Sequence, residues 1–403
     1  MDSAILNDPF LLAKKHLLEL TRGLPSGTVP VSVIQDLSSM HPDWPVWPDL
    51  ALSDLIGPPN VRLKEVDLRW LHRFRATIAL LGWLSAQLGG PKGGPSALSL
   101  VVERAPILGH RGWGAVSAGG SCRILTTADG QIAANLPRVE DQSSVAAWLD
   151  APIEGTDWAS IERAVQQVTS SELLSRAKLL GMPISAVGET KVPSGFEYNI
   201  GKEIQLKQKP RVVDLSSMWA GPLCSWYLMR CGAEVTKIES LLRPEKQRNR
   251  PDIFYQRLNQ GKEIIPLDFS SSKDLERLRN IIRGSDIIIE GSRPRALEHL
   301  GIDAKEEVER GAIWCSITGY GRRWNPHRVG FGDDAAAGAN LLAEINGSLW
   351  FMGDAIADPI TGATAATLVL GYWLGCSSAL LDLGLSPTAA LYSQGLLSRA
   401  SSF

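Results

Sequence analysis

An aspartate followed by a proline stands at the start of an apolar, helix-like run near the end of the chain. The segment GDAIADPITGATAATLVLG places Asp358 directly before Pro359. Asp is favoured at a helix N-cap and Pro at the first helical position, so the pair predicts a helix that begins here. The helix amides would favour the ionised carboxylate and lower its pKa. Such a carboxylate could act as a nucleophile in acyl transfer, although it could equally serve only as a helix cap.

The run that follows Asp358 is expected to be a buried helix. Residues 361–381 carry no charge and are long enough to span a bilayer, but Gly, Ser and Thr recur among them and no basic cluster flanks them. A closely similar run occurs earlier, since ATIALLGWL (76–84) matches ATLVLGYWL (366–374). Each copy precedes a Gly/Ser/Pro break and a second apolar run. This repetition predicts an internal duplication.

From Pro210 onward, strand-like runs alternate with helical segments. The strand-like runs are RVVDLSS, EVTKIES, EIIPLDF, DIIIEGS and AIWCSITGYG, and helical stretches include 271–283 and 294–310. This alternation predicts a parallel, Rossmann-like sheet with helices on both faces, in which ligands bind beyond the carboxyl ends of the strands. The residues expected at that edge are Ser216, Ser217, Glu239, Ser292 and Thr318. Most of them would be ordinary turn and cap residues.

The sequence before residue 205 has a different pattern. A helical stretch (64–88) and the Gly-rich break GGPKGGP lead to two strand-like runs, with Asp129-Gly130 as a hairpin signal between them. Amphipathic helical stretches follow at 143–150 and 157–181, so a smaller α+β domain is predicted. The predicted parts are an N-terminal extension (1–60), a small-domain half (61–205) and a Rossmann-like domain (206–403).

Composition and charge exclude several classes of protein. The 403 residues include 41 basic and 43 acidic side chains, which leaves no basic footprint for nucleic acid or an anionic membrane. The N-terminal segment lacks the order of a signal peptide. The five Cys are an odd number without a CxxC pair, which favours buried thiols in a reducing cytosol over disulfides or a metal site. We therefore expect a cytoplasmic protein with no metal and no nucleic-acid or membrane partner.

Several segments, taken in order, resemble class III CoA transferases, the CaiB/BaiF or formyl-CoA transferase family. They are VVDLSSMWAGPLCSWYLMRCGAEVTKIES, LNQGKEIIPLDF, SDIIIEGSRPRALEHLGI, AIWCSITGYG and IADPITG, and they cover residues 210–403. The resemblance implies a CaiB/BaiF-like fold, a homodimer that could be interlocked, and Asp358 as the catalytic aspartate. In that family the carboxylate attacks an acyl-CoA to give a mixed aspartyl anhydride. Coenzyme A then moves from one carboxylic acid to another.

The N-terminal half resembles the later half of the same family. Residues 70–110 resemble the helix after the catalytic aspartate, and SAGGSCRILTTADGQIAANL resembles the glycine loop and first strands of the family's small domain. Gly119 and Gly120 would then belong to the substrate loop. The order of the halves is inverted, which implies a trimmed tandem duplication or a near-permutation. One site could be assembled within one chain or across a dimer.

The resemblance also implies contacts with coenzyme A. The residues at the matching positions are Ser217, Trp219, Ala220, Lys237, Lys262, Leu267, Gly291, Ser292 and Arg293. Ser217 and Trp219 replace the His and Gln of formyl-CoA transferase, and Trp219 could shape an apolar acyl pocket or belong to the core. Gly291 and Ser292 replace the usual Asn and its neighbour, which weakens the implied contact there.

Two alternatives stay open. α-Methylacyl-CoA racemases share the fold and use a His where VGFGDDAAAG has Asp333, while His327 stands six residues earlier. Because the chain lacks that His, a racemase or other proton-transfer enzyme is a less favoured prediction than a transferase. Asp67 stands ahead of the first repeated run, at the place that Asp358 has before the second, but it lacks the Pro and Gly that follow Asp358. We therefore expect Asp67 to be a surface carboxylate or a relic. A rearranged, non-catalytic CoA-binding or partner subunit is the other alternative.

Overall fold

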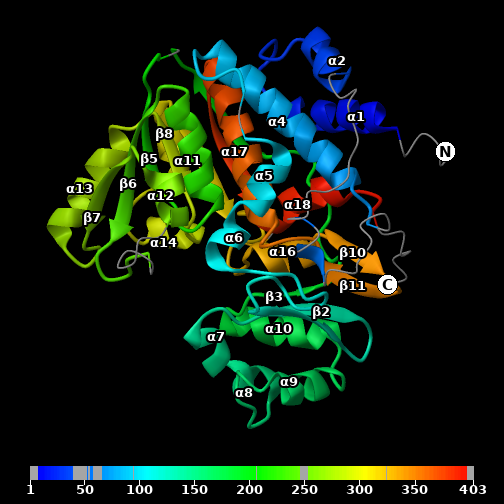
Figure 1. Cartoon of the computed structure of the whole chain (residues 1–403). Helices are drawn as coiled ribbons and strands as arrows, with labels where there is room; N and C mark the ends of the chain where they lie inside the picture. Colours follow the sequence, from blue (N-terminus) through cyan, green and yellow to red (C-terminus); the bar gives the residue numbers. More distant parts are fainter. Residues whose placement is uncertain are drawn as a thin grey trace.

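The structure is a computed structural model of the 403-residue chain. It describes residues 8–39, 52, 55–57, 66–93, 95–205, 207–245, 253–323 and 325–396. Within these residues the chain forms a large sheet with helices on both faces, a helical layer beside it, and a smaller domain below (Figure 1). The boundary predicted at residue 60 lies outside the described residues.

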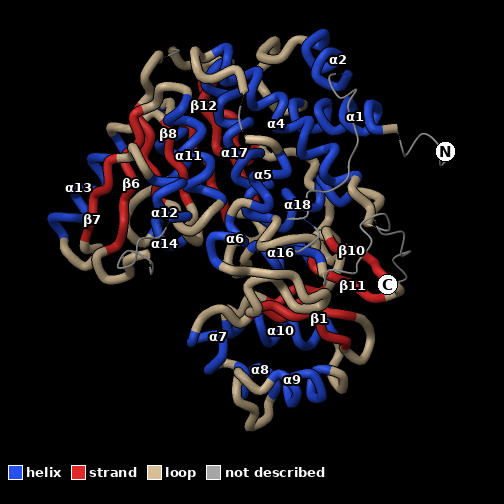
Figure 2. The backbone as a smooth tube through the Cα atoms, viewed as in Figure 1, coloured by secondary structure: helices blue, strands red, loops and turns tan. Residues whose placement is uncertain are grey.

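A seven-stranded sheet forms the centre of the larger part (Figure 2). In spatial order its strands are β4 (Glu197–Glu203), β12 (Ser377–Gly384), β9 (Ile313–Thr318), β8 (Ile287–Glu290), β5 (Arg211–Leu215), β6 (Glu234–Ser240) and β7 (Glu263–Leu267). Neighbouring strands are parallel except at the edge, where β4 pairs antiparallel with β12. The predicted α/β class with a mostly parallel sheet is confirmed. The sheet starts earlier than predicted, since β4 precedes residue 206.

Helices cover both faces because successive residues of a strand point to opposite sides. They are α11 (Ala220–Arg230), α12 (Ile253–Asn259), α13 (Ser272–Arg283), α14 (Pro294–Glu298), α15 (Ala304–Arg310) and α17 (Ala357–Leu374). On β8, Ile287 and Ile289 join the core formed with α11 and α17, whereas Ile288 joins the core under α13. The helix predicted over 294–310 is divided in two, because Asp303 caps a new helix.

The two repeated apolar runs lie on α4 and α17, which pack against each other. Of these two helices, α4 spans Arg69–Gln87. The same layer contains α1 (Pro9–Thr21), α2 (Val31–Ser39), α5 (Ala97–Val102), α6 (Arg104–Leu108) and α18 (Leu385–Ser393). Buried polar contacts cross the layer: Thr77 Oγ1 lies 2.8 Å from His16 Nε2 and 2.8 Å from the Tyr392 hydroxyl, which lies 2.7 Å from Thr364 Oγ1. These contacts join α1 to the core helices α4, α17 and α18.

The uncharged run 361–381 belongs to two elements, because α17 ends at Leu374 and β12 begins at Ser377. A Cβ at Gly362 would come within 2.6 Å of the Ala220 carbonyl oxygen, so glycine there lets α17 and α11 approach closely. No helix in the described part of the chain has the length and apolar character needed to cross a membrane. The prediction of a buried core helix is confirmed for α17.

The smaller domain is built on an antiparallel sheet. Its elements are β1 (Cys122–Thr126), β2 (Gln131–Asn135), α7 (Val139–Ser143), α8 (Val145–Leu149), α9 (Trp158–Val165), α10 (Ser170–Leu180) and β3 (Ile184–Ala186). The predicted hairpin is confirmed, since β1 and β2 pair across Asp129 and Gly130. The helical stretch predicted over 157–181 is broken, because Asp157 caps α9 and Thr169 caps α10 separately.

The small domain docks on the sheet half of the same chain. The contact is made with α16 (Gly332–Gly338), which precedes the hairpin of β10 (Leu342–Ile345) and β11 (Ser348–Phe351). Asn135 Nδ2 donates to Asp334 Oδ1 at 2.9 Å, and the Ser185 hydroxyl donates to the Asp334 carbonyl at 2.7 Å. A single chain therefore brings the two halves together.

Candidate active site

Asp358 is the point at which the buried helix α17 reaches solvent. Of its residues Ala357–Leu374, only Asp358 and the last residue, Leu374, are not buried. The helix begins at Ala357 with Ile356 as its N-cap, so Asp358 lies in the first turn rather than at the cap. The predicted start was two residues late, because the carbonyl of Ala355 already accepts a hydrogen bond from the Asp358 amide at 2.9 Å.

The pKa of Asp358 is raised to about 6. Burial is the main cause and the nearby carboxylate of Asp354 adds to it, whereas Arg104 and the backbone amides of Ala220 and Gly332 act in the opposite direction. The prediction that the helix terminus lowers the pKa of Asp358 therefore has the wrong sign. The backbone amides do act to lower the pKa, as expected, but burial outweighs them. The outcome is a carboxylate that is largely ionised at neutral pH yet more basic than an ordinary Asp.

Gly332 provides the space that the Asp358 carboxylate occupies. A Cβ at position 332 would lie 2.2 Å from Asp358 Oδ2 and 2.5 Å from the carbonyl oxygen of Ala355. Real Cβ atoms do not approach so closely, so only glycine fits without displacement of the carboxylate or the turn before it. On the other side, the Ala220 amide at the start of α11 faces the same carboxylate. Ala220 is thus one of the predicted contact residues that the structure brings to Asp358.

Arg104 and Asp354 form an ion pair beside Asp358 that the sequence did not predict. Arg104 Nε donates to Asp354 Oδ2 at 2.8 Å, and Nη2 donates to Oδ1 at 2.5 Å. Burial alone would raise the pKa of Asp354, but hydrogen bonds from Arg104 and His110 outweigh it and lower the pKa to about 2. Asp354 is therefore ionised, and the N-terminal half supplies a cation to the end of the sheet half that carries Asp358.

His110 connects this ion pair to the predicted glycine loop. Its Nδ1 lies 3.2 Å from Asp354 Oδ1. A Cβ at Gly119 would lie 3.4 Å from His110 Cε1, so the loop passes directly beside the imidazole. Gly120 follows with a φ of +78°, a conformation that favours glycine. Gly119, His110 and the turn before Asp358 come together within one chain, which is the cis arrangement that the sequence left open.

The turn before α17 is strained and is held by a buried acid. Ala355 has a φ of +45°, and its N–H donates to Asp333 Oδ1 at 2.8 Å. Burial, followed by the neighbouring Asp354, raises the pKa of Asp333 to about 7. A non-glycine residue in this conformation costs about 1–3 kcal/mol and persists where its surroundings enforce it. Asp333, which occupies the racemase histidine position, therefore positions the turn that carries Asp354 and leads to Asp358.

Four predicted contact residues gather at the carboxyl ends of β5 and β8. Ser217 and Gly291 are exposed there, and a Cβ at Gly291 would lie 3.1 Å from Ser216 Cα. Ser292 Oγ donates to Glu290 Oε1 at 3.2 Å, and Arg293 is exposed at the start of α14. This is the edge of the sheet at which the parallel topology predicts ligand binding.

Trp219 belongs to the core rather than to an open acyl pocket. Its side chain is 1% exposed. The Arg104 guanidinium lies 4.7 Å from the centre of its ring on one side, and Phe254 meets it edge-on at 5.1 Å. The Trp219 ring therefore packs against the Arg104 guanidinium and helps to hold it in place. Of the two interpretations that the sequence left open for Trp219, the structure favours packing.

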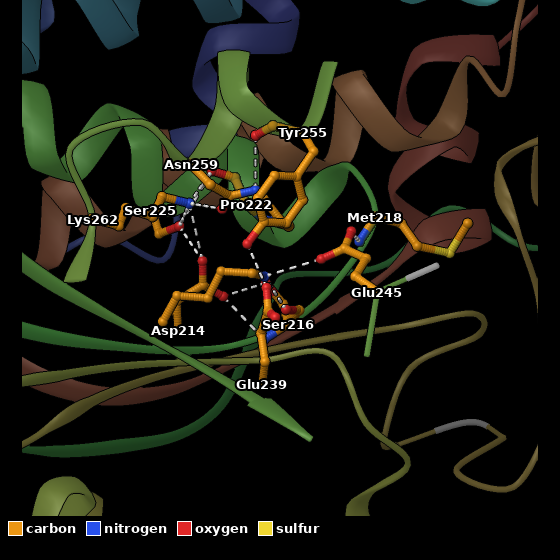
Figure 3. A network of polar contacts seen from close by, with 11 residues as sticks. Asp214, Ser216, Met218, Pro222, Ser225, Glu239, Glu245, Tyr255, Asn259 and Lys262 are labelled. Carbon is orange, nitrogen blue, oxygen red and sulfur yellow. Dashed lines mark hydrogen bonds and ion pairs between the residues drawn. The ribbon is translucent and has the colours of Figure 1, made fainter. Parts of the chain in front are cut away.

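The two predicted lysines are engaged inside the protein, and Figure 3 shows the contacts of Lys262. Lys262 Nζ donates to four buried acceptors: Asp214 Oδ2 at 3.1 Å, the Pro222 carbonyl at 3.0 Å, Ser225 Oγ at 2.7 Å and Asn259 Oδ1 at 3.0 Å. Lys237 is 1% exposed; it donates to the Ser216 carbonyl at 2.8 Å and faces Glu245 Oε2 at 3.4 Å. Their predicted role near the CoA nucleotide has to be revised to a structural one. Both fix the start of the loop between β5 and α11.

Other predicted residues at the sheet edge are also structural. Leu267 is fully buried, and its carbonyl accepts the Leu241 N–H at 2.9 Å, so its predicted contact has to be revised as well. Glu239 is 5% exposed and accepts a hydrogen bond from the Tyr255 hydroxyl. The Thr318 hydroxyl accepts the Gly321 N–H at 2.9 Å, as expected of a turn residue.

No local sequence signal points to Arg104, His110 or Asp354 as site residues. Arg104 and Asp354 are 250 positions apart and His110 and Asp354 are 244 apart, so their pairing depends on how the two halves dock.

Comparison with known proteins finds relatives of the sheet half. Residues 208–373 match the sequence model of CoA-transferase family III, so the resemblance to that family is confirmed for this segment. An acyl-CoA transferase of Fusarium pseudograminearum is 29% identical over 217 residues, which are 46% of this chain and 47% of the relative. A succinyl-CoA:mesaconate CoA-transferase of Haloarcula hispanica is 28% identical over 30% of this chain and 34% of its own length.

A formyl-CoA:oxalate CoA-transferase of Streptomyces coelicolor is 30% identical over 28% of this chain and 29% of its own length. The chain thus spans about half or less of the length of the curated relatives it matches. Among solved structures, a CAIB/BAIF family protein from Brucella suis is 23% identical with a TM-score of 0.41, over 47% of this chain and 55% of that chain. A hypothetical protein from Mycobacterium tuberculosis is 23% identical with a TM-score of 0.43, over 48% and 58%.

Proposed function

We propose that the chain is a CoA transferase that moves coenzyme A between carboxylic acids, with Asp358 as the nucleophile. The observation that carries this proposal is that Asp358 is the one partly exposed residue of α17 before its last residue, and that its carboxylate is held by the amides of Ala220 and Gly332. The names of the relatives support CoA transfer, since two of them are succinyl-CoA:mesaconate and formyl-CoA:oxalate CoA-transferases.

The chemistry starts with the ionised carboxylate. An Asp358 oxygen attacks the thioester carbonyl carbon, the carbon–sulfur bond breaks, and CoA leaves as thiolate from a mixed aspartyl anhydride. The thiolate then returns to give an aspartyl thioester, from which the second acid accepts CoA, or the incoming acid displaces directly. A carboxylate with a raised pKa is a better nucleophile than an ordinary carboxylate, provided that it is still ionised at the working pH.

The surroundings of Asp358 suit this role. The amides of Ala220 and Gly332 orient the carboxylate, and Arg104 offsets part of the negative charge that Asp354 and Asp333 place near it. We place the CoA substrate along the carboxyl ends of β5 and β8. There the exposed Ser217 and Gly291 and the half-buried Ser292 leave room for its chain, and the exposed Arg293 is available to a phosphate.

The direct test is a CoA-transfer assay. The chain is incubated with succinyl-CoA or formyl-CoA and a panel of mono- and dicarboxylic acids, and new CoA thioesters are separated by chromatography. We expect formation of at least one new thioester that depends on Asp358. α-Deuterium exchange in D₂O without CoA transfer would instead support a racemase-type enzyme, and absence of any CoA-thioester binding by calorimetry would support a non-catalytic subunit.

We further propose that the protein works as a cytoplasmic homodimer, as the family resemblance implies. The cysteines support a reducing compartment, since all five are free thiols and four of them are buried. Sedimentation equilibrium of the purified chain tests the assembly. A twofold mass is expected, and a purely monomeric species that is active in CoA transfer would contradict the dimer.

Gly332→Ala is expected to reduce CoA transfer by about 100-fold or more, because the added methyl group displaces the Asp358 carboxylate and misplacement by 1 Å can cost that much. The measurement is kcat for the transfer that the wild-type chain catalyses best. Gly353→Ala is the matched control, since its Cβ would meet the nearest atom, Ile356 Cδ1, at an ordinary 3.5 Å. Equal activity of the two variants would contradict the proposed packing around Asp358.

The rate of CoA transfer is expected to rise with pH through a midpoint near 6. The raised pKa of Asp358, about 6, means that its nucleophilic form is lost as the pH falls through this value. The profile of kcat/KM between about pH 4.5 and 8 measures it. Asp333 and Asp334, each with a pKa raised to about 7, also titrate in this range, and Asp333 holds the turn before Asp358. The midpoint should therefore persist in Asp333→Asn, and its disappearance would assign the titration to Asp333 instead.

A further inference from the structure

The pair formed by His110 and Asp354 has no task in CoA transfer between carboxylic acids. In that reaction the nucleophile, the leaving groups and the accepting acid are anions, so no base is needed to remove a proton. Yet the structure places a histidine against an ionised carboxylate four residues before the nucleophile. This arrangement is typical of a general base, which requires a substrate that carries a proton.

Asp354 fixes the orientation of the imidazole. Asp354 has no exposed side-chain area, and Arg104 holds both of its oxygens at 2.8 and 2.5 Å. An ionised carboxylate 3.2 Å from His110 Nδ1 selects the form of the ring that carries a proton on Nδ1. The lone pair is then on Nε2, where it can accept a proton, as in other histidine–aspartate pairs.

The free side of the imidazole is open to solvent. The His110 side chain is 24% exposed, in contrast to the buried Asp354. It faces the glycine loop, where a Cβ at Gly119 would lie 3.9 Å from Nε2 and one at Gly120 would meet nothing within 4 Å. Asp354, which contacts His110, also acts electrostatically on Asp358, and a base in contact with solvent at this point takes its proton most readily from water.

We propose that His110 and Asp354 allow this chain to pass the acyl group from Asp358 to water, which gives it acyl-CoA hydrolase activity. This inference rests on the proposed acylation of Asp358. Water attacks the acyl carbon of the anhydride while His110 Nε2 takes one of its protons, and the bond between that carbon and the Asp358 oxygen breaks. Asp358 leaves as carboxylate, and His110 returns its proton to the CoA thiolate. Acyl-CoA and water thus give the carboxylate, CoA and one proton.

The test measures hydrolysis and transfer on the same preparations of full-length chain. Thiol release from acetyl-CoA and from succinyl-CoA without an acceptor acid reports hydrolysis, and the CoA-transfer assay reports transfer. His110→Asn is expected to lower the ratio of hydrolysis to transfer by about 100-fold or more. Asp354→Asn should lower it in the same direction, because the amide no longer selects the proton on Nδ1. His327→Asn, at an exposed histidine, is the control and should leave the ratio unchanged.

The outcomes separate this inference from the proposed function. An unchanged ratio in His110→Asn, or an acyl adduct on Asp358 of the wild-type chain without measurable thiol turnover, overturns the inference and leaves the transferase intact. Incorporation of α-deuterium from D₂O that depends on His110 overturns it in favour of proton transfer at carbon. Absence of both the adduct and thiol release overturns the proposed function, and the inference with it. Thermal unfolding of each variant shows that the chains compared are folded.

Discussion

Asp358→Asn is expected to abolish CoA transfer, with a loss of at least about a thousandfold in kcat. The amide keeps the size of the side chain and one oxygen that can accept a hydrogen bond, but it cannot form an anhydride. Because Asp358 is half-buried and has a raised pKa, its removal as a charge costs the fold little. The loss should therefore appear in activity while thermal unfolding changes only slightly, and both are measured on the purified chain.

The chain contains its own control for this substitution. Asp67 precedes α4 much as Asp358 starts α17, but Asp67 accepts hydrogen bonds from the amide and the side chain of Arg69, at 3.0 Å and 2.8 Å. Asp67→Asn should leave CoA transfer within a factor of about two. Loss of transfer in Asp67→Asn with retention in Asp358→Asn would assign the reaction to the other copy of the repeat.

Lys262→Met is expected to lower the free energy of unfolding by about 3–5 kcal/mol. The substitution removes the cation from a fully buried ion pair and leaves the Asp214 carboxylate without it, 0% exposed and surrounded by core. Lys262 and Lys237 hold the pKa of Asp214 well below its usual range against the effect of burial, so loss of Lys262 leaves a buried charge that Lys237 and the hydroxyls of Ser216 and Ser225 compensate only in part. Urea denaturation at neutral pH measures the change.

Two further variants sharpen that experiment. Lys273→Met, at an exposed position on α13, removes the same charge from the surface and should change the stability by less than about 0.5 kcal/mol. Asp214→Asn combined with Lys262→Met should recover part of the loss, because the unpaired charge is then gone. If Lys262→Met alone lowers the free energy of unfolding by less than about 1 kcal/mol, the structural role of Lys262 is contradicted. The prediction that this lysine is free to contact a nucleotide phosphate would then stand again.

Much of the fold could be predicted because its signals are local. The strand-like runs of β5, β6, β8 and β9 are largely buried, and the runs of β5 to β9 alternate with helices that have caps such as Ser271 and Asp303, so the alternation is visible in the sequence. The hairpin at Asp129 and Gly130 is equally local. Errors occurred at helix boundaries, as at Asp358 and Thr169, where a cap or a strained turn decides the start of a helix.

The candidate site could be predicted only in part, because its charges meet through tertiary contacts. The Asp358 position followed from the family pattern, but the sign of its pKa shift depends on burial, which the helix terminus alone does not reveal. Lysines 237 and 262 stand where contacts with a nucleotide were implied, yet their chains turn inward toward Asp214 and Ser216. Arg104 and His110 reach the site only because the small-domain half docks on the sheet half.

Trapping of the acyl group on Asp358 tests the central claim most directly. The chain is mixed with succinyl-CoA, treated with hydroxylamine and digested, and the peptide that contains Asp358 is examined by mass spectrometry. We predict a hydroxamate at Asp358 that forms only with the acyl-CoA and is absent from Asp358→Asn. Full CoA transfer with no modification at Asp358, or a modification at another carboxylate, would contradict the proposed mechanism.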